Sequence, residues 1–292
     1  TKTVDRNVTI QDNAVAERTD SDSDGAGGND VTMSGDHAYS TPGHEDTWFD
    51  LSTDGSFQLA VGWSDADSDE TLYAVLTPTL SGAAAGDTVM GTQFRYSTDG
   101  GSTWVTQSYY GDPVEVPAQY LDTLQVKLPS DVSGTLTIGV QAGTSDTDPD
   151  TGVTVTAVSG SSTLSLIRFD PVADAVTMAL NGRAAGLEDT EIPLSVKTTS
   201  SDPSETFNVT ISGIPAGAKI TYNGVEQTVS GNSVTILNFS NSAPLSVTPP
   251  PNSNADFSLT VSAVSVDGTD SSAAVSREID VSVTGDADFA VI

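Results

Sequence analysis

The feature that most constrains the fold of this chain is an alternation of apolar and polar side chains with a period of two residues. It recurs in segments such as 134–142 (GTLTIGVQA), 206–212 (TFNVTIS) and 257–264 (FSLTVSAV). Successive side chains of a β-strand point to opposite faces, so this alternation is typical of strands with one buried and one wet face. No segment shows a convincing helical period, and turn signals such as Asn223-Gly224 separate the runs. The sequence therefore predicts an all-β fold of antiparallel β-sandwiches.

The chain also repeats itself. GHEDTWFDLS at 43–52 matches GLEDTEIPLS at 186–195, which begins 143 residues later. Further along each copy, SDADSDETLYAVLT at 64–77 is echoed by SSDPSETFNVTIS at 200–212. Such a repeat indicates modules with a shared plan. We expect two tandem β-sandwich domains stacked end to end: a longer first module over 1–178, which includes an acidic N-terminal extension, and a second over 179–292.

Charge limits the partners of the chain. The 292 residues include 10 Lys or Arg and 40 Asp or Glu, which gives a net charge of −30. This charge repels nucleic acid and anionic membrane surfaces, and the shortage of basic residues leaves most carboxylates facing water or a cation. Cysteine is absent, which excludes disulfides, thiolate zinc sites and cysteine nucleophiles. We expect several bound calcium ions and no nucleic-acid partner.

Hydropathy gives no sign of a membrane segment. The sequence has no run of 18 apolar residues, and its first ten residues lack the apolar core of a secretion signal. The first residue is Thr rather than Met. We therefore expect a fragment that does not insert into a membrane.

The stretch TDSDSDGAGGND at 19–30 has the spacing of a calcium loop. Its alternate carboxylates, followed by Gly25, can converge on one hard cation. A full EF-hand loop has a bidentate Glu at position 12, which Val31 occupies here. A solvated acidic loop is the alternative. The candidate ligands are Asp20, Asp22, Asp24 and Asp30.

Acidic residues also recur where modules end and begin. IQDNAVAE ends at Glu17, IRFDPVAD at Asp174 and VTGDAD at Asp288, while Glu45-Asp46 and Glu188-Asp189 occupy the same place in the repeat. If two sandwiches stack end to end, Asp174 of one module can meet Glu188-Asp189 of the next, and one calcium ion there would cross-link them. Ordinary polar hinge residues are the alternative.

Three further acidic groups lie in loops, where Asp is also a common turn former. The repulsion within DADSDE at 65–70, which lies between two strands, favours a metal site. DTDPD at 146–150 fits a metal or a solvated turn equally, and DGTD at 267–270 fits a solvated turn better. The candidate ligands in the first two are Asp65, Asp67, Asp69, Asp146, Asp148 and Asp150.

The repeat resembles a known family, the Ig-like or cadherin-like repeats of giant type I-secreted RTX adhesins of bacteria. The likeness rests on GLEDTEIPLS, SDPSETFNVTISGIPAGAKI, LSVTPPPNSNADFSLTVSA, FRYSTDGGSTW and YLDTLQVKLPSDVSGTLTIGVQA, and it covers the chain from about Gly43 to Asp288. It implies an extracellular β-sandwich segment at the bacterial cell surface, stiffened by calcium at and near domain junctions, that extends an adhesin and supports cell adhesion or biofilm formation. Its partners would be the neighbouring repeats of the same chain, and it would be a monomer.

The resemblance also implies ligands in the second module and at its junction with the first. Its acidic positions correspond to Asp174, Glu188, Asp189, Asp202 and Glu205. The family usually has a further Asp and Gly where Pro203 and Ser204 stand here, and this departure weakens or removes that site.

Two rival functions follow from the residues. An enzyme needs a nucleophile with a base or an open metal site; only His37 and His44 can act as imidazole bases and no catalytic motif surrounds them, so we expect no enzyme. A calcium-dependent module that binds a glycan or peptide is the second rival, because TWVTQSYYGDPVEV in the longer module places Trp104, Tyr109 and Tyr110 near Asp112. The alternative is that Trp104 and one Tyr belong to the core.

Overall fold

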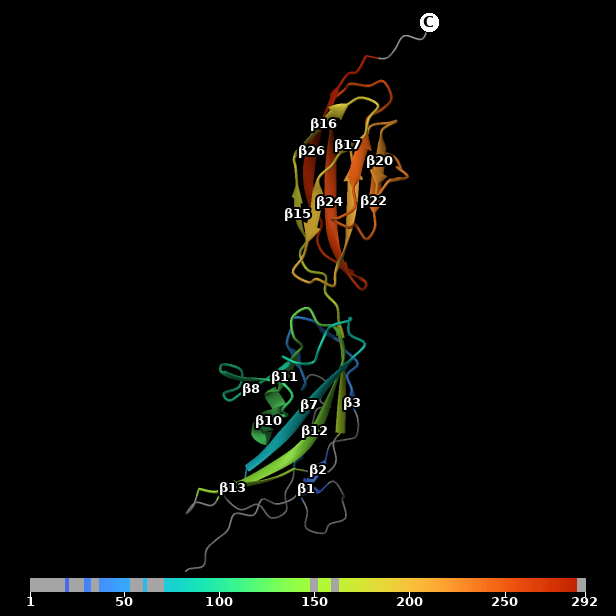
Figure 1. Ribbon diagram of the computed structural model, residues 1–292. Helices are drawn as coiled ribbons and strands as arrows, with labels where there is room; N and C mark the ends of the chain where they lie inside the picture. Colours follow the sequence, from blue (N-terminus) through green and yellow to red (C-terminus); the bar gives the residue numbers. More distant parts are fainter. Residues whose placement is uncertain are drawn as a thin grey trace, which may run out of the picture. The chain divides into compact units, whose positions relative to one another are not determined.

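The computed structural model describes residues 19–20, 29–32, 37–52, 60–61, 71–147, 152–158 and 163–287. The chain divides into two compact units, Thr1–Asp170 (unit 1) and Pro171–Ile292 (unit 2). The regular secondary structure of the described residues is almost entirely β-strand (Figure 1), so the predicted all-β fold is confirmed. The boundary lies earlier than the one predicted after residue 178, because Val176 and Met178 are buried in the core of unit 2.

Unit 1 is a sandwich of two main sheets. The larger sheet has the strand order β10 (Val114–Pro117), β7 (Thr71–Ser81), β12 (Gly134–Thr147), β14 (Thr163–Asp170) and β3 (His37–Ala38), with β13 (Thr154–Val158) on β12 and β4 (Gly43–His44) on β14. The facing sheet has the order β5 (Phe49–Asp50), β11 (Gln125–Lys127), β8 (Gln93–Ser97) and β9 (Trp104–Ser108). A small third sheet contains β1 (Thr19–Asp20), β2 (Asn29–Thr32) and β6 (Ala60–Val61).

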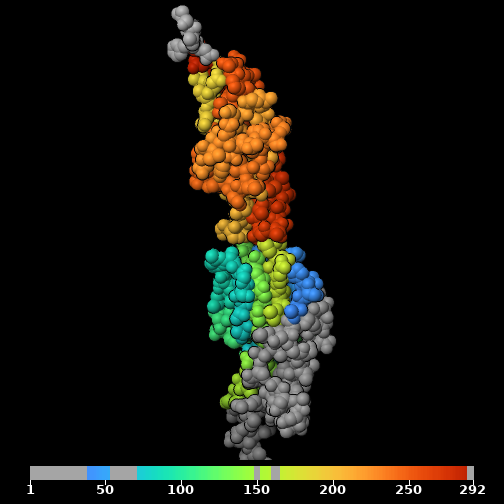
Figure 2. All heavy atoms as spheres, turned by 90° about the vertical axis from the view of Figure 1, so that its right-hand side faces the viewer, coloured from blue at the N-terminus to red at the C-terminus, as the bar shows by residue number. Residues whose placement is uncertain are grey.

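The larger sheet is visible from outside in Figure 2, where β7 (cyan), β12 (green), β14 (yellow-green) and residues 37–52 (blue) lie side by side. A 3-10 helix, η1 (Ala118–Thr123), leads to β11. None of the helices in the described residues is long and apolar enough to cross a membrane.

The core of unit 1 lies between its two main sheets. The alternation of β12 buries Leu136, Ile138 and Val140, which are at most 1% exposed. Phe94 of β8 and Val126 of β11 belong to the same buried cluster from the facing sheet. The period-2 pattern therefore marks the inner face that the sequence predicts.

Unit 2 repeats this architecture. Its larger sheet has the order β16 (Arg183–Leu187), β26 (Val275–Thr284), β24 (Phe257–Asp267), β19 (Thr206–Ser212) and β22 (Ser233–Ile236), with β25 (Asp270–Ser271) on β24. The facing sheet contains β17 (Ile192–Pro193), β23 (Leu245–Thr248), β20 (Lys219–Tyr222) and β21 (Val225–Glu226), and β15 (Thr177–Leu180) pairs with β18 (Val196–Thr199). Both units are therefore β-sandwiches built mainly from antiparallel strands.

The repeated GxEDT segment has the same place in each unit. In unit 1, β4 pairs in parallel with the last strand, Gly43 opposite Phe169; in unit 2, β16 does the same, Gly186 opposite Val283. A Cβ on Gly43 would lie 2.8 Å from a ring carbon of Phe169, and a Cβ on Gly186 would lie 2.7 Å from a side-chain carbon of Ile192. The two glycines are matched because each strand crosses close to a large core side chain.

Candidate metal centre

Acidic side chains from three loops meet at the proximal end of unit 2, where the chain enters the unit. Asp174 precedes β15, and Asp202 and Glu205 lie in the turn between β18 and β19. Asp267 ends β24, which pairs with β19 at this end. We call Asp174, Asp202 and Glu205 the acid cluster.

Hydrogen bonds orient the acid cluster. The backbone N–H of Asp174 donates to Glu205 Oε1, and Ser201 Oγ donates to Asp174 Oδ2 at 2.6 Å. The backbone N–H and Oγ of Ser204 donate to the two carboxylate oxygens of Asp202 at 2.6 and 2.8 Å. Ser204 departs from the adhesin pattern, yet it holds Asp202 in place. A carboxylate has about four acceptor sites, so each member keeps capacity for a further ligand.

Two members of the acid cluster are buried. Asp202 is 4% exposed and Glu205 is 7% exposed, and Glu205 Oε2 is a buried oxygen without a hydrogen-bond partner. Burial raises the pKa of the Glu205 carboxyl above its ordinary value of 4.5, and the charges of Asp174 and Asp202 raise it further, against the lowering effect of hydrogen bonds from Ser200 and Asp174. Among the described residues, no ion pair to a basic side chain involves these three carboxylates. Their negative charges therefore lack compensation within unit 2.

The donor set fits a calcium ion. Calcium takes six to eight oxygen ligands at about 2.3–2.6 Å, and it prefers carboxylates and carbonyls. A carboxylate oxygen of Asp202 lies within 4.8 Å of one of Asp267, so Asp267 is a fourth candidate ligand. A cation would satisfy Glu205 Oε2 and remove the repulsion between buried charges. Asp174, Asp202 and Glu205 are the residues that would hold it.

Two acidic residues of this end were not among the predicted ligands. Asp267 lies near Asp202, and Asp270 Oδ2 accepts a hydrogen bond of 2.9 Å from the backbone N–H of Ala173. The sequence favoured a solvated turn for this DGTD segment, and Asp270 is indeed exposed. The pairing of β24 with β19, which brings the turn to the acid cluster, is a long-range contact that local pattern does not reveal.

Asp174 and the Glu188-Asp189 pair, expected to meet, lie at opposite ends of unit 2. The carbonyl of Asp174 accepts a hydrogen bond from Ser265 Oγ, near the proximal end of β24. The backbone N–H of Glu188 donates to the carbonyl of Thr284 at 2.9 Å, where β26 ends. Since β26 has ten residues and a strand rises about 3.3 Å per residue, roughly 30 Å separate the two ends. The prediction that Asp174 meets Glu188-Asp189 around one calcium ion is therefore wrong.

The paired acids of the repeat have matching contacts instead. Glu45 is 3% exposed and its backbone N–H donates to the carbonyl of Asp170, as that of Glu188 does to Thr284. Glu188 Oε1 also accepts a 2.8 Å hydrogen bond from the backbone N–H of Asp286. The second acid of each pair, Asp46 or Asp189, accepts a hydrogen bond from a neighbouring turn. These contacts give the repeated Glu-Asp a structural role in each unit.

Unit 1 gives partial information on its predicted ligands. Asp20 in β1 lies opposite Asp30 in β2 in a parallel pairing, so the backbone brings the two ends of the acidic stretch together. Asp146 lies in β12 opposite Val155 and is 5% exposed. The remaining predicted ligands, Glu17, Asp22, Asp24, Asp65, Asp67, Asp69, Asp148, Asp150 and Asp288, lie outside the described residues.

The predicted aromatic ligand site does not assemble as expected. Tyr109 is buried in the core of unit 1 at 9% exposure, whereas Tyr110 is 75% exposed. Trp104 lies in β9, where its ring contacts the guanidinium of Arg95 at 4.3 Å. The structure therefore separates the three aromatic side chains of this stretch into core and surface.

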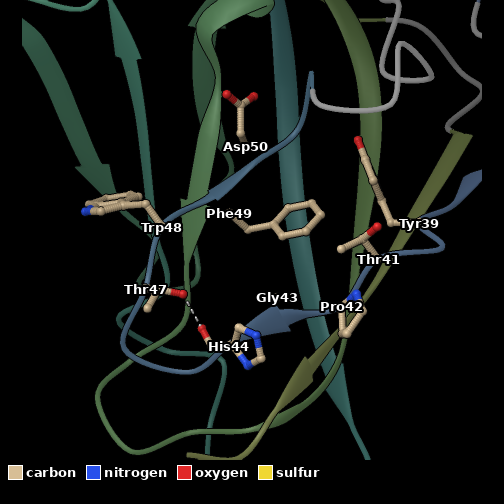
Figure 3. Close-up of a pocket in the computed structure, with 9 residues that line it drawn as sticks. All are labelled: Tyr39, Thr41, Pro42, Gly43, His44, Thr47, Trp48, Phe49 and Asp50. Atoms are coloured by element: carbon tan, nitrogen blue, oxygen red, sulfur yellow. Dashed lines mark hydrogen bonds between the residues drawn. The ribbon is translucent and has the colours of Figure 1, made fainter.

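A cavity of about 480 Å³ lies elsewhere in unit 1, along residues 39–50 (Figure 3). Phe49 points into it towards Tyr39, whereas Trp48 points to the other side of β5. The hydroxyl of Tyr39 donates to the carbonyl of Leu51 at 2.7 Å, and the ring packs edge-on against Phe49. The cavity is thus an opening beside two core side chains that already engage each other, and apart from Gly43 its other lining residues are half-buried or exposed.

Comparison with known proteins adds little to this description. No protein-family model and no curated protein match the chain. Among solved structures, it is similar to the fibronectin(III)-like modules of Clostridium thermocellum CbhA, at 10% sequence identity and a TM-score of 0.22, over 72% of this chain and 86% of that one. It is also similar to a structure described as BspA_C_mut, at 9% identity and a TM-score of 0.23, over 73% and 84% of the two chains.

Proposed function

We propose that this chain is a calcium-stiffened structural segment of a bacterial surface adhesin, acting outside the cell as a monomer in support of adhesion or biofilm formation. The observation that carries the proposal is the buried Glu205 Oε2, which lacks a partner beside the carboxylates of Asp202 and Asp174. A net charge of −30 without any cysteine fits a chain that uses calcium in place of disulfides. The resemblance of the repeats to RTX adhesins supplies the setting.

Calcium acts in this proposal by fastening the segment that enters unit 2. The last strand of unit 1 ends at Asp170, and Asp174 belongs to the acid cluster. Between them, the backbone N–H of Ala173 is bound by Asp270. An ion shared by Asp174, Asp202 and Glu205 would fix this segment to unit 2 and shorten the stretch after Asp170 that is free to bend. Without the ion, the like charges push Asp174 away from Glu205 and Asp202.

A structural role needs fewer assumptions than catalysis. The acid cluster lies at the end of a sandwich, next to the inter-unit segment, and each carboxylate is already oriented by serine or backbone donors. Such a site gives a cation several bonds of fixed direction, and these bonds would hold the segment that connects the two units. A joint that bends loses reach, so a segment that projects a binding tip benefits from stiff connections.

Small-angle X-ray scattering of the full chain tests this function. We expect one narrow distribution of interatomic distances in millimolar calcium and a broader one in EDTA, with both units folded in each. Asp174→Asn should give the broad distribution even in calcium, because a neutral amide is a weak calcium ligand. Glu226→Gln, which removes one charge from an exposed ion pair with Lys219, is the matched control and should behave like the wild type. Equal distributions with and without calcium would overturn the proposal.

A further inference from the structure

Unit 1 carries a partly exposed stack of two indoles and one guanidinium on the outer face of its smaller sheet. The guanidinium carbon of Arg95 lies 4.1 Å from the ring centre of Trp48 and 4.3 Å from that of Trp104. The three side chains come from β8, β9 and the residue before β5, and each is partly exposed. We call them the tryptophan–arginine ladder.

Hydrogen bonds fix the ladder in one geometry. Arg95 Nε donates to Gln125 Oε1 of the neighbouring strand at 2.7 Å. Trp104 Nε1 donates to the carbonyl of Gly101 at 3.2 Å. In Figure 3, Trp48 points to the side of β5 opposite Phe49, so the ladder faces outward while Phe49 faces the core. A surface held in this way loses little entropy when a ligand binds.

The fold does not require the ladder, because unit 2 has the same sheet without it. Strand register and the sequence repeat align Trp48 with Glu191, Arg95 with Thr221, Gln125 with Ser246 and Trp104 with Gly224. Small or polar residues therefore suffice at all four positions in the sister domain. The ladder is a feature of unit 1 alone.

The face of the ladder also gathers basic side chains in a strongly negative chain, next to the carboxylate of Asp50, which lies opposite Gln125. The described part of unit 1 has three basic residues, Arg95, Lys127 and Arg168. Two of them lie on this face, since Lys127 is two residues from Gln125 on β11 and pairs with Gln93 next to Arg95. Gln93 and Thr106, the residue opposite Arg95 on β9, add polar groups around the aromatic rings. The combination suits a ligand with both an apolar ring face and an anionic group.

We propose that the tryptophan–arginine ladder binds a saccharide that carries a carboxylate, such as a uronic or sialic acid. The guanidinium has five N–H donors, of which the bond to Gln125 uses one, and its fork matches the geometry of a carboxylate. The indoles offer large rigid apolar surface for the C–H face of a sugar ring. The side chains of Gln93 and Thr106 can donate hydrogen bonds to sugar hydroxyls and accept hydrogen bonds from them. Binding needs no calcium, so it is independent of the metal centre of unit 2.

Isothermal titration of the full chain in EDTA tests this inference. The probes are trigalacturonate against its methyl ester, and 3′-sialyllactose against lactose, so that each acidic sugar has a neutral match. We expect binding of at least one acidic member, about tenfold or more tighter than its neutral match. The two pairs distinguish a uronic acid from a sialic acid as the source of the carboxylate.

Variants separate binding from a purely structural role of the ladder. Arg95→Gln and Trp104→Ala should each weaken binding about tenfold or more. Arg168→Gln, which removes a basic side chain that is 73% exposed on the other sheet, should bind like the wild type. The melting temperature of every variant shows whether unit 1 is folded. If Trp104→Ala does not fold, Trp104→Phe, which shortens the aromatic surface, takes its place.

Three outcomes would overturn the inference. They are no binding of either acidic probe up to about 10 mM, equal binding of acidic and neutral sugars, or unchanged binding in folded Arg95→Gln. If the ladder binds a protein and not a saccharide, neither acidic probe should bind.

Discussion

The backbone N–H of Asn252 donates a 3.0 Å hydrogen bond to Asp189 Oδ1, and both residues have a left-handed backbone, with φ of 56° and 59°. Unit 1 repeats this contact between Asp131 and Asp46, at 3.4 Å and with φ of 59° and 58°. Each contact joins two tight turns at the end of a sandwich. Asp and Asn are among the few residues that adopt this conformation readily. The Asp of the repeated GxEDT segment is therefore a structural residue that fastens one turn to another.

We expect Asp189→Ala to destabilise unit 2 by about 1–3 kcal/mol. The variant loses the acceptor for the backbone N–H of Asn252, and alanine adopts the left-handed backbone conformation of this position less readily than aspartate does. Asp189→Asn keeps a side-chain acceptor and a residue that adopts the left-handed conformation readily, so it should lower the free energy of unfolding by less than about 1 kcal/mol. Thermal or urea unfolding of both variants measures the difference.

The same measurement distinguishes a turn residue from a calcium ligand. The cost of Asp189→Ala should be equal in EDTA and in millimolar calcium. A cost that disappears in EDTA would show that Asp189 acts through a bound ion, against the turn assignment.

The glycine that opens the repeated segment gives a second prediction. Gly186→Ala places a Cβ 2.7 Å from Ile192 Cγ1, inside the core, and we expect a loss of about 1–3 kcal/mol in the free energy of unfolding. Gly182→Ala is a matched control just before the same strand, since its Cβ would find its nearest neighbour at 3.9 Å. Equal stability of the two variants in urea unfolding would contradict the close approach at Gly186.

Much of the fold follows from the sequence, because its signals are local. Leu136, Ile138 and Val140 alternate with polar residues, and this pattern alone assigns them to a buried face. The match of GHEDTWFDLS with GLEDTEIPLS predicts two similar units, and the parallel pairing of β4 and β16 with the last strand of each unit confirms the shared plan. The unit boundary was misplaced because Met178 is buried by contacts within unit 2, which no local pattern reveals.

The candidate site was harder to predict, because its members come together through strand pairing. Asp202 and Glu205 were among the predicted ligands, but their neighbour Asp267 was assigned to a solvated turn. Asp174 was expected to meet Glu188-Asp189, which lie at the other end of the unit. The ladder was missed for the same reason, since Trp48 and Arg95 lie far apart in sequence and meet across β11, which separates β5 from β8 in the smaller sheet.

Glu205 should respond to mutation with opposite signs in the two metal states. In EDTA, Glu205→Gln should raise the melting temperature, because it removes a buried charge that lacks compensation. In calcium at about ten times its dissociation constant, the wild type should gain about 1.4 kcal/mol, which the variant lacks. A variant that is less stable than the wild type by the same amount in both conditions would contradict a role in binding calcium.

The pH dependence of this variant has a defined sign. The pKa of Glu205 is raised in the folded state, so the apo fold is stabilised by this group below the unfolded value of 4.5 and loses that stabilisation as the pH rises through the folded pKa. The advantage of Glu205→Gln over the wild type in EDTA should therefore be largest at neutral pH and shrink as the pH falls towards 4.5. Melting curves of both proteins over this range check the trend, and an advantage independent of pH would exclude Glu205 as its source.

The central claim is that calcium binds the acid cluster of unit 2, and an anomalous difference map from crystals grown in calcium tests it most directly. We expect a peak bonded at about 2.3–2.6 Å to carboxylate oxygens of Asp202 and Glu205, with Asp174 in the same coordination shell. A well-ordered acid cluster at saturating calcium without a peak within bonding distance of Glu205 Oε2 would contradict the account.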